Sequence, residues 1–351
     1  MRRVEVTAKL SPKILQALHT LLDLDINTIT AAWSACSEKG RGYFVRRIRQ
    51  APSGKVRTLH TPQPSVFQAQ RQILRRVLYA LPTSPSSYGG VPGRSHISAA
   101  RVHFAHAGEI IQADILDAFG QSTYGQLAKT LRDALKPTLW ALQLKREERH
   151  ILVGWLTHMM MINPEGGRYP RLPLGTPTST AAFNILWAPI DAVITKLCHQ
   201  LSPENPIRYT RYVDDLVFSS SPTMSDELLP RLHHLLEDFG YSINREKTRR
   251  GPTETAVIHG LCLRDGQVDL PNEAILRLSQ RLHRLNALLS SAPTVQEWTL
   301  AAQLIQELDF LVNTVYRDAP CPQGLLVSPE LRNLVASRQL QPARWADELW
   351  G

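Results

Sequence analysis

The feature that most constrains the fold is the pair Asp214-Asp215, which interrupts an aromatic and β-branched run from Tyr209 to Phe218. Such flanks predict two short strands joined by a tight turn. Turns of this kind usually place Gly or Asn beside Asp, because one residue must adopt a positive φ, and neither follows here. The two adjacent carboxylates also repel each other unless a divalent cation neutralises them. The alternative is an ordinary solvent-exposed Asp-Asp turn that binds nothing.

A second acidic segment upstream can complete a metal site. Residues 110–115 form a short apolar run that ends in a carboxylate at Asp114. Phosphoryl transfer by two metal ions needs carboxylates from separate strands, which hold ions about 3.5–4 Å apart. The pattern therefore predicts that Asp114, Asp214 and Asp215 meet around two divalent metal ions, one activating the attacking hydroxyl and one stabilising the leaving pyrophosphate.

The basic charge of the chain is concentrated in one segment. The formal net charge is +9, and residues 41–108 contain no Asp or Glu. The basic residues of that segment are Arg41, Arg46, Arg47, Arg49, Lys55, Arg57, Arg71, Arg75, Arg76, Arg94 and Arg101. A face that serves only solubility would mix both signs. We therefore interpret the segment as a nucleic-acid surface, with an ordinary basic surface as the alternative.

The cysteines and the hydropathy of the chain indicate the compartment. The four cysteines are far apart and match no zinc-binding spacing, so we expect free thiols in a reducing cytoplasm. Met1 is followed by a mixed run rather than by an apolar segment, so no signal peptide is expected. No uncharged apolar stretch of about 18 residues occurs, which argues against a membrane span.

The order of strand and helix patterns predicts an α+β fold rather than a doubly wound sheet, because no regular βαβ alternation is present. We divide the chain into a helical N-terminal extension (1–40), a central domain (41–270) and a helical C-terminal domain (271–351). The expected elements are a helix capped by Ser11, a hairpin turning at Ser53-Gly54, a helix capped by Ser65 and ending near Leu81, helices at 122–136, 145–162, 178–201 and 225–239, and a strand pair at 256–270.

The acidic motifs resemble those of the reverse transcriptase family. Tyr212-Val-Asp-Asp215 is similar to the family's Tyr-x-Asp-Asp box, and Asp114 matches its first catalytic aspartate. The resemblance covers residues 41–270 and implies a right-hand polymerase, with fingers, an antiparallel palm sheet and a helical thumb. It also implies that Mg²⁺ is the cofactor.

Further boxes follow in the family's order. Pro173-Leu-Gly175-Thr-Pro177 resembles a loop that lies against the incoming nucleotide and the template, so Gly175 and Pro177 are implied to contact substrate. A Gly-rich turn capped by Thr178 or Ser179 suits close approach of a base or sugar. The alternative is an ordinary capped helix start. Leu174 replaces the usual Gln, so one polar contact is missing.

Four other residues match roles in the family. Lys55 and Arg57 alternate on a strand, so they share one face, and they resemble the pair that grips the triphosphate. Phe119 occupies the place of the aromatic gate that excludes a ribose 2′-hydroxyl, with a core phenylalanine as the alternative. Lys247 matches the lysine that protonates pyrophosphate, with a surface lysine as the alternative.

Other details are most similar to bacterial retron reverse transcriptases. Two longer segments carry this resemblance, the run from Tyr209 to Ser219 and Gly90-Val-Pro-Gly-Arg-Ser95. Two short elements also carry it, Ala99-Ala-Arg-Val-His103 and Ile258-His-Gly260. In those two elements Ala99 stands where retrons have Asn, and His259 where they have Thr, which leaves the priming mode open. The residues implied to contact nucleic acid are Arg71, Arg75, Arg94, His103, Arg277, Arg281 and Arg284. For His103 the alternative is a core or surface histidine, and for the last three a solvated helix face.

The resemblance implies an RNA-directed DNA polymerase that copies a cognate structured non-coding RNA into short DNA, in anti-phage defence. Its implied partners are that RNA, the RNA–DNA hybrid, deoxynucleoside triphosphates and a separate effector protein. Two alternatives stay open. One is a defence-associated reverse transcriptase with protein-primed or template-independent synthesis, and the other is a non-catalytic RNA-binding scaffold.

Overall fold

The structure is a computed structural model of the whole chain. The residues it describes are 10–37, 42–49, 54, 56–104, 108–163, 170–221, 223–289, 294–316, 321–322, 325–329 and 333. The Ser53 half of the expected hairpin turn lies outside these residues.

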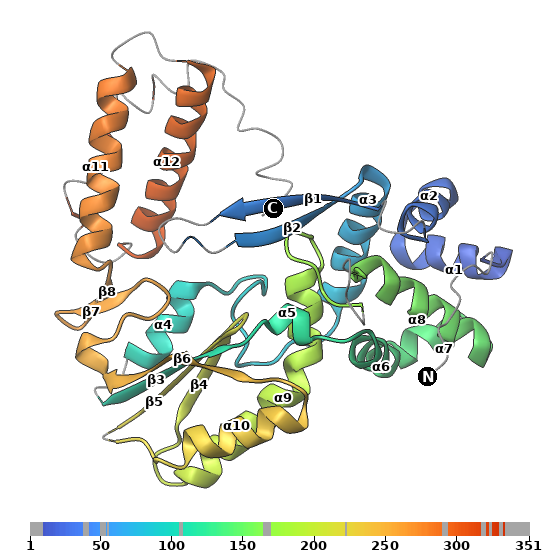
Figure 1. Cartoon of the computed structure of the whole chain (residues 1–351), viewed down its shortest axis with the longest axis horizontal. Coiled ribbons are helices and arrows are strands. Elements are labelled where there is room, and N and C mark those ends of the chain that lie inside the picture. The colour runs from blue at the N-terminus through green and yellow to red at the C-terminus, as the bar shows by residue number, and fades with distance from the viewer. Residues whose placement is uncertain are drawn as a thin grey trace.

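Helices and strands are mixed along the chain, as expected for an α+β fold (Figure 1). The helices are α1 (Pro12–Leu22), α2 (Ile26–Ser37), α3 (Pro64–Gln72), α4 (His96–Phe104), α5 (Ala118–Gln121), α6 (Tyr124–Ala134), α7 (Lys136–Ala141), α8 (Arg146–Met160), α9 (Ser179–Leu201), α10 (Leu228–Asp238), α11 (Asn272–Leu289) and α12 (Val295–Thr314). The strands are β1 (Tyr43–Arg49), β2 (Val56–Pro62), β3 (Glu109–Ile115), β4 (Arg208–Tyr212), β5 (Asp215–Ser220), β6 (Ile243–Pro252), β7 (Cys262–Arg264) and β8 (Gln267–Asp269).

The central element is a four-stranded antiparallel sheet in the order β4-β5-β3-β6. Alternate residues of its inner strands enter two different cores, because successive strand residues point to opposite faces. Leu216 and Phe218 pack into the larger core with α9 and α10, whereas Val217 and Ile110 pack with α4 and the C-terminal helices. The sheet is thus covered on both faces.

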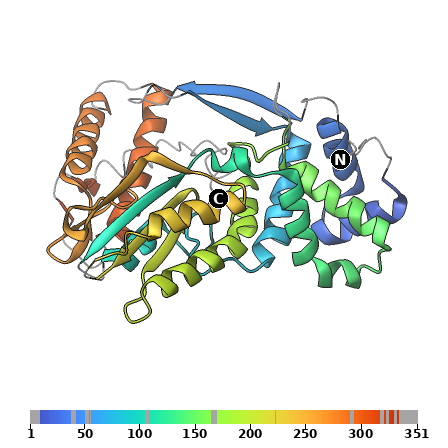
Figure 2. The ribbon, with the colours of Figure 1, turned by 60° about the horizontal axis from the view of Figure 1, so that its bottom comes forward.

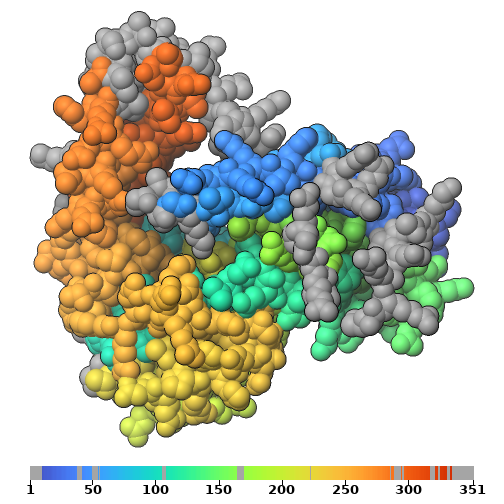
Figure 3. All heavy atoms as spheres, in the orientation of Figure 1, coloured from blue at the N-terminus to red at the C-terminus, as the bar shows by residue number. Residues whose placement is uncertain are grey.

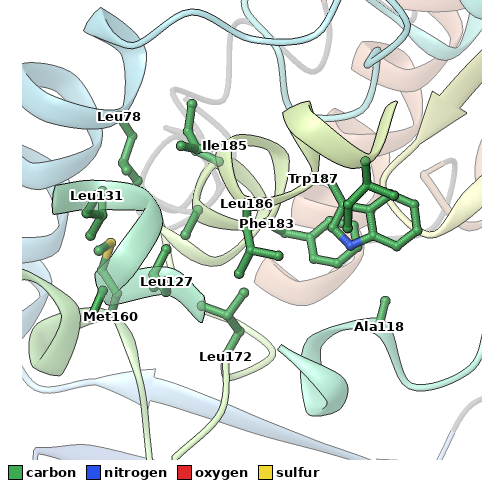
Figure 4. Close-up of a cluster of buried hydrophobic side chains, with 14 of the residues drawn as sticks. Leu78, Ala118, Leu127, Leu131, Met160, Leu172, Phe183, Ile185, Leu186 and Trp187 are labelled. Atoms are coloured by element: carbon green, nitrogen blue, oxygen red, sulfur yellow. The ribbon is translucent and has the colours of Figure 1, made fainter. Parts of the chain in front are cut away.

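The larger core joins the sheet to the N-terminal half of the chain. Figure 4 shows its centre, where side chains of α6, α8 and α9 converge; the labelled residues include Leu127, Met160 and Trp187. The N-terminal helices α1 and α2 enter the same core, and Ser11 caps α1 by accepting a hydrogen bond from the Ile14 N–H, as expected.

Two parts extend from this body and face each other. Figures 1 and 2 both show the β1–β2 hairpin pointing toward α12. The helices α11 and α12 pack side by side, with Leu278, Leu282 and Leu308 buried in the second core. Figure 3 shows an open gap between these orange helices and the blue hairpin. The gap is framed by the hairpin on one side and by the helical pair on the other.

Several boundaries differ from the expectation. Ser65 does not cap α3; Gln63 is the N-cap and Pro64 the first helical residue, which suits a residue that lacks an N–H. The long strand β6 was not expected, because its run Ile243–Pro252 is strongly charged and half exposed. The Asp265-Gly266 turn between β7 and β8 is confirmed, with both residues at positive φ.

Among the described residues, α9 is the one helix long and apolar enough to span a membrane. Most of it is buried inside the fold, where it packs against α10 and the sheet. It also contains Pro189 and a buried charge at Asp191. These features are those of a core helix.

Candidate active site

Three aspartates from two distant segments meet at one end of the sheet. Asp114 on β3 lies directly opposite Asp215 on β5, so their side chains share one face. Asp214 occupies the turn before β5, and its carbonyl accepts a hydrogen bond of 2.9 Å from the Ile115 N–H. The structure therefore brings together the three carboxylates that the sequence predicted to converge.

The turn that carries the paired aspartates has an unusual backbone. Val213 has a φ of +57°, a conformation that β-branched residues rarely adopt. Its carbonyl accepts a hydrogen bond of 2.9 Å from Nη1 of Arg211. Gly89 lies against the other side, and a Cβ added there would be 2.6 Å from Cγ2 of Val213. The strained turn is thus held from two sides, and Gly89 leaves the space that it needs.

A fully buried ion pair lies next to this turn and supports it. Arg211 and Asp191 are both 0% exposed, and the guanidinium donates from Nη2 at 2.8 Å and from Nε at 2.9 Å. Asp191 accepts a third bond of 2.7 Å from the Tyr209 hydroxyl. Nη1 of Arg211 also donates to Asn184, whose side chain donates to the Gly89 carbonyl. One network therefore reaches both the Val213 carbonyl and the Gly89 carbonyl.

Burial and mutual repulsion perturb the acidic groups. Partial burial, followed by the charges of Asp214 and Asp114, raises the pKa of Asp215 to about 6. Burial also raises the pKa of Asp214, as does the charge of Asp114, whereas Lys247 and Arg57 act in the opposite direction. The cluster thus carries more negative charge than its surroundings compensate.

Lys247 reaches this cluster from β6. Its Nζ lies 2.6 Å from Oδ1 of Asp114. The β3–β6 pairing is irregular at this point: Gln112 pairs with Arg249 but Asp114 pairs with Asn244, so two steps on β3 correspond to five on β6. The extra residues form a bulge, a feature that redirects side chains. The bulge contains Lys247, whose side chain is exposed and pairs with Asp114, and its role as a proton donor stays a prediction.

The three carboxylates suit a divalent cation by their chemistry, but their oxygens do not yet surround a single point. Within the described ranges, no group of three or more His, Cys, Asp or Glu side chains has a ready-made metal-binding geometry. The ammonium of Lys247 occupies one side of Asp114, and 51% of the Asp215 side chain is exposed. Carboxylate oxygens that repel one another at an accessible strand end are the ligands that Mg²⁺ prefers.

One of the two residues predicted to bind the triphosphate lies on the β1–β2 hairpin. Arg57 on β2 is exposed, and its charge acts on the pKa of Asp214. Lys55 lies outside the described residues. The loop before α9 contacts the same hairpin, since the His60 N–H donates 2.8 Å to the Leu174 carbonyl. Gly175 is exposed with a φ of +90°, and Pro177 is half-buried.

Two predicted details of this region can be refined. Thr178 is the N-cap of α9, but its side chain makes no capping bond; Ser179 donates instead to the Pro173 carbonyl at 2.6 Å. Phe119 is half-buried, and its ring packs edge-on against Phe183, with centroids 5.5 Å apart. It packs against the larger core, and its role as a sugar gate stays a prediction.

Two residues predicted to contact nucleic acid are committed to other contacts. His103 is 0% exposed, with Nδ1 2.8 Å from the Ser219 hydroxyl and Nε2 2.7 Å from the Thr210 hydroxyl. Burial lowers its pKa to about 3. The prediction that it contacts RNA directly is therefore wrong. Arg94 donates to backbone carbonyls of the loop before α4, including Ser84 at 2.8 Å, so it braces that loop.

The other predicted nucleic-acid residues are more accessible. Arg75 is exposed, and Arg71 is half-buried with its guanidinium over the Phe67 ring. On α11 the predicted arginines Arg277, Arg281 and Arg284 are all exposed. Arg281 forms an exposed ion pair of 3.0 Å with Glu307 of α12. Their role as phosphate contacts stays a prediction.

Some residues of the site were not predicted. Arg211, Asp191 and Gly89 support the turn, and His259 lies beside Asp215. A signal for part of the ion pair was present, because Asp191 is the one acid in the apolar run 179–201. Buried charges of opposite sign are expected to pair.

An antiparallel sheet with acidic residues at one end, covered by helices and faced by a hairpin and a helical pair, defines a right-hand polymerase palm with fingers and thumb. No family model matches the chain. Two retron reverse transcriptases of Myxococcus xanthus, Mx65 and Mx162, are 32% and 30% identical to it over 205 and 214 residues. The Ec86 retron reverse transcriptase of Escherichia coli is 23% identical over 240 residues. The predicted resemblance to retron-type reverse transcriptases is thereby confirmed.

The extent of these matches is limited. The first two cover 56% of this chain, but 45% and 42% of the relatives, so the chain spans less than half the length of these two proteins. The third covers 68% of both chains. Among solved structures, telomerase from Candida tropicalis matches with a TM-score of 0.44 and 12% identity without RNA, over 85% of this chain and 61% of that chain. The same telomerase in complex with a fragment of telomeric RNA matches with a TM-score of 0.47 and 14% identity, over 89% of this chain and 59% of that chain. Scores of this size carry no argument about function.

Proposed function

We propose that the chain is an Mg²⁺-dependent RNA-directed DNA polymerase of the retron type. The observation that carries the proposal is the register that sets Asp114 opposite Asp215, with Asp214 in the adjoining strained turn. The raised pKa of Asp215 supports it, because a cluster of uncompensated carboxylates is costly unless cations bind there.

Each proposed residue has a task that its own chemistry suits. The three aspartates would hold two Mg²⁺ ions, which activate the primer hydroxyl and stabilise the leaving pyrophosphate. Arg57 would bind triphosphate oxygens from the β1–β2 hairpin, together with Lys55. Lys247, as an ammonium beside the site, would donate a proton to the departing pyrophosphate.

The template in this proposal is a structured non-coding RNA, and the product is a short DNA made in anti-phage defence within the cytoplasm. The basic segment 41–108 supports a polyanionic partner. The exposed arginines of α11 suit an A-form hybrid, which is recognised by shape and phosphate contacts. A separate effector protein would read out the product.

Primer extension on an RNA template tests the proposal. We expect Asp214→Asn and Asp215→Asn each to abolish incorporation of deoxynucleotides while the protein stays folded. Asp226→Asn, a change at an exposed acid of the same domain, is the matched control and should leave synthesis intact. Undiminished synthesis by the two active-site variants would refute the assignment of the site.

The rivals give different results in the same system. A scaffold that only binds RNA would incorporate no nucleotide at any Mg²⁺ concentration. A polymerase with another priming mode would incorporate, but the nucleic acid that copurifies with it would be long repetitive or random DNA. A branched RNA–DNA molecule would support the retron assignment.

A further inference from the structure

His259 lies beside the acidic cluster, although 44 residues separate it from Asp215 in the chain. Its Nδ1 is 3.8 Å from Oδ2 of Asp215, and its ring packs against Tyr212 with centroids 5.1 Å apart. The side chain is 6% exposed, and Nε2 has no hydrogen-bond partner among the described residues. One ring nitrogen therefore faces the carboxylate, and the other is buried without a partner.

A two-residue turn presents this imidazole. Ile258 and Leu261 exchange both backbone hydrogen bonds, at 2.8 and 2.9 Å, so His259 and Gly260 form the turn, with φ of +51° and +81°. Two positive φ values are typical of a type I′ turn, which favours Asn-Gly. Histidine is not what the turn prefers, and an unpartnered buried nitrogen costs about 1–3 kcal/mol. A locally unfavourable residue beside a reactive group suggests a functional reason for it.

The surroundings determine which nitrogen carries the proton. A lone pair on Nδ1 would face the carboxylate of Asp215 and repel it, and the Nε2–H would then be a buried donor without an acceptor. A proton on Nδ1 replaces this repulsion by attraction, since the N–H then faces the carboxylate, and it leaves on Nε2 an unpartnered lone pair in place of an unpartnered N–H.

We propose that His259 is a positioning residue, whose Nδ1–H holds the Asp215 carboxylate in the orientation that binds a cation. The inference rests on the proposed function, because it takes Asp215 as a metal ligand. The separation of 3.8 Å is longer than a hydrogen bond, so the proposed bond requires the half-exposed Asp215 side chain to turn toward the ring. Partners outside the ligand set fix the orientation of metal-binding side chains, and their loss weakens metal affinity by about 10–100-fold.

The turn offers two variants that separate the donor from the backbone. Asn suits a positive φ and has an N–H close to the position of the imidazole Nδ1, whereas Gly suits the φ and has no donor. The readout is Mn²⁺ binding to the full chain, followed by electron paramagnetic resonance without turnover. We expect His259→Gly to weaken binding by about 10–100-fold and His259→Asn to stay close to the unmodified protein.

Asp215→Asn provides the reference for this comparison. If it weakens Mn²⁺ binding and His259→Gly does not, the positioning role is overturned and the proposed function stands. The role is also overturned if His259→Asn binds as weakly as His259→Gly. If Asp215→Asn itself leaves binding unchanged, the metal site is wrong and the role of His259 falls with it.

A measurement on the unmodified protein tests the same arrangement without metal binding. The ring ¹⁵N shifts of labelled histidines distinguish a proton on Nδ1 from one on Nε2, and the His259→Asn spectrum identifies the signal of His259. We expect the proton on Nδ1. A neutral ring with its proton on Nε2 would overturn the proposal.

Discussion

The ion pair between Arg211 and Asp191 should determine both the stability of the palm and the position of the catalytic turn. Asp191→Asn keeps the shape of the side chain but leaves a guanidinium that is 0% exposed without its counterion. Removing one partner of a buried pair costs about 3–5 kcal/mol. With an unfolding entropy of about 2.1 cal/mol/K per residue, the 351 residues correspond to roughly 0.7 kcal/mol/K, so the melting temperature should fall by about 4–7 °C.

A double variant separates stability from positioning. Asp191→Leu with Arg211→Met replaces both charges by apolar side chains, and such replacements are often neutral or stabilising. We therefore expect the melting temperature to recover. Nucleotide incorporation should stay low, because the Val213 carbonyl loses the donor on Arg211 that holds the strained turn.

The assays are thermal unfolding by calorimetry and single-nucleotide primer extension under saturating substrate. The reasoning is refuted if Asp191→Asn melts and extends like the unmodified protein. If the double variant regains both stability and incorporation, the ion pair does not position the turn for catalysis, since the pair would then serve packing alone.

Three other perturbations follow from the site. Gly89→Ala should strongly reduce primer extension, because its Cβ would lie 2.6 Å from a Val213 methyl group, while Gly125→Ala, with open space around it, is the matched control. Arg57→Ala should raise the KM for deoxynucleotides by about 10–100-fold, the equivalent of a charge-assisted bond, whereas Arg47→Ala, on the opposite face of the hairpin, should not. Burial holds the pKa of His103 at about 3, so the unfolded chain takes up a proton below about pH 6.5 and the folded one does not. Urea unfolding should therefore show stability falling from pH 6.5 toward pH 4, and His103→Gln should show a smaller fall; equal slopes for both proteins would contradict the assignment.

The sequence allowed good predictions where the pattern is local. The strands on either side of Asp214-Asp215, the apolar run that ends at Asp114 and the helix that begins after Ser11 all depend on neighbours in the chain. Their aromatic, β-branched and capping residues act through the backbone of the same segment. The order of the acidic boxes then sufficed to predict that three carboxylates meet.

Predictions failed where the partner is distant. β6 was missed because its exposed, charged run lacks the alternation of a half-buried strand, and it is held instead by pairing with β3. The direct RNA contact predicted for His103 was wrong for a related reason. Its partners Thr210 and Ser219 come from β4 and β5, more than 100 residues away, and nothing near His103 in the chain indicates that it is buried between them.

The groups that support the acidic cluster have one property in common that can be recognised in the sequence: each is an unexpected residue type at its position. Asp191 in a long apolar helix, Arg211 at a buried strand position and His259 in a turn that prefers Asn are each locally unexpected. Each is unfavourable alone, because burial of a charge or of an unpartnered ring nitrogen costs free energy. In the fold each of them is linked to the turn at Val213-Asp214-Asp215, where repelling carboxylates and a strained backbone need external support. Local inconsistencies in this chain therefore indicate the position of the site as strongly as its acidic motif does.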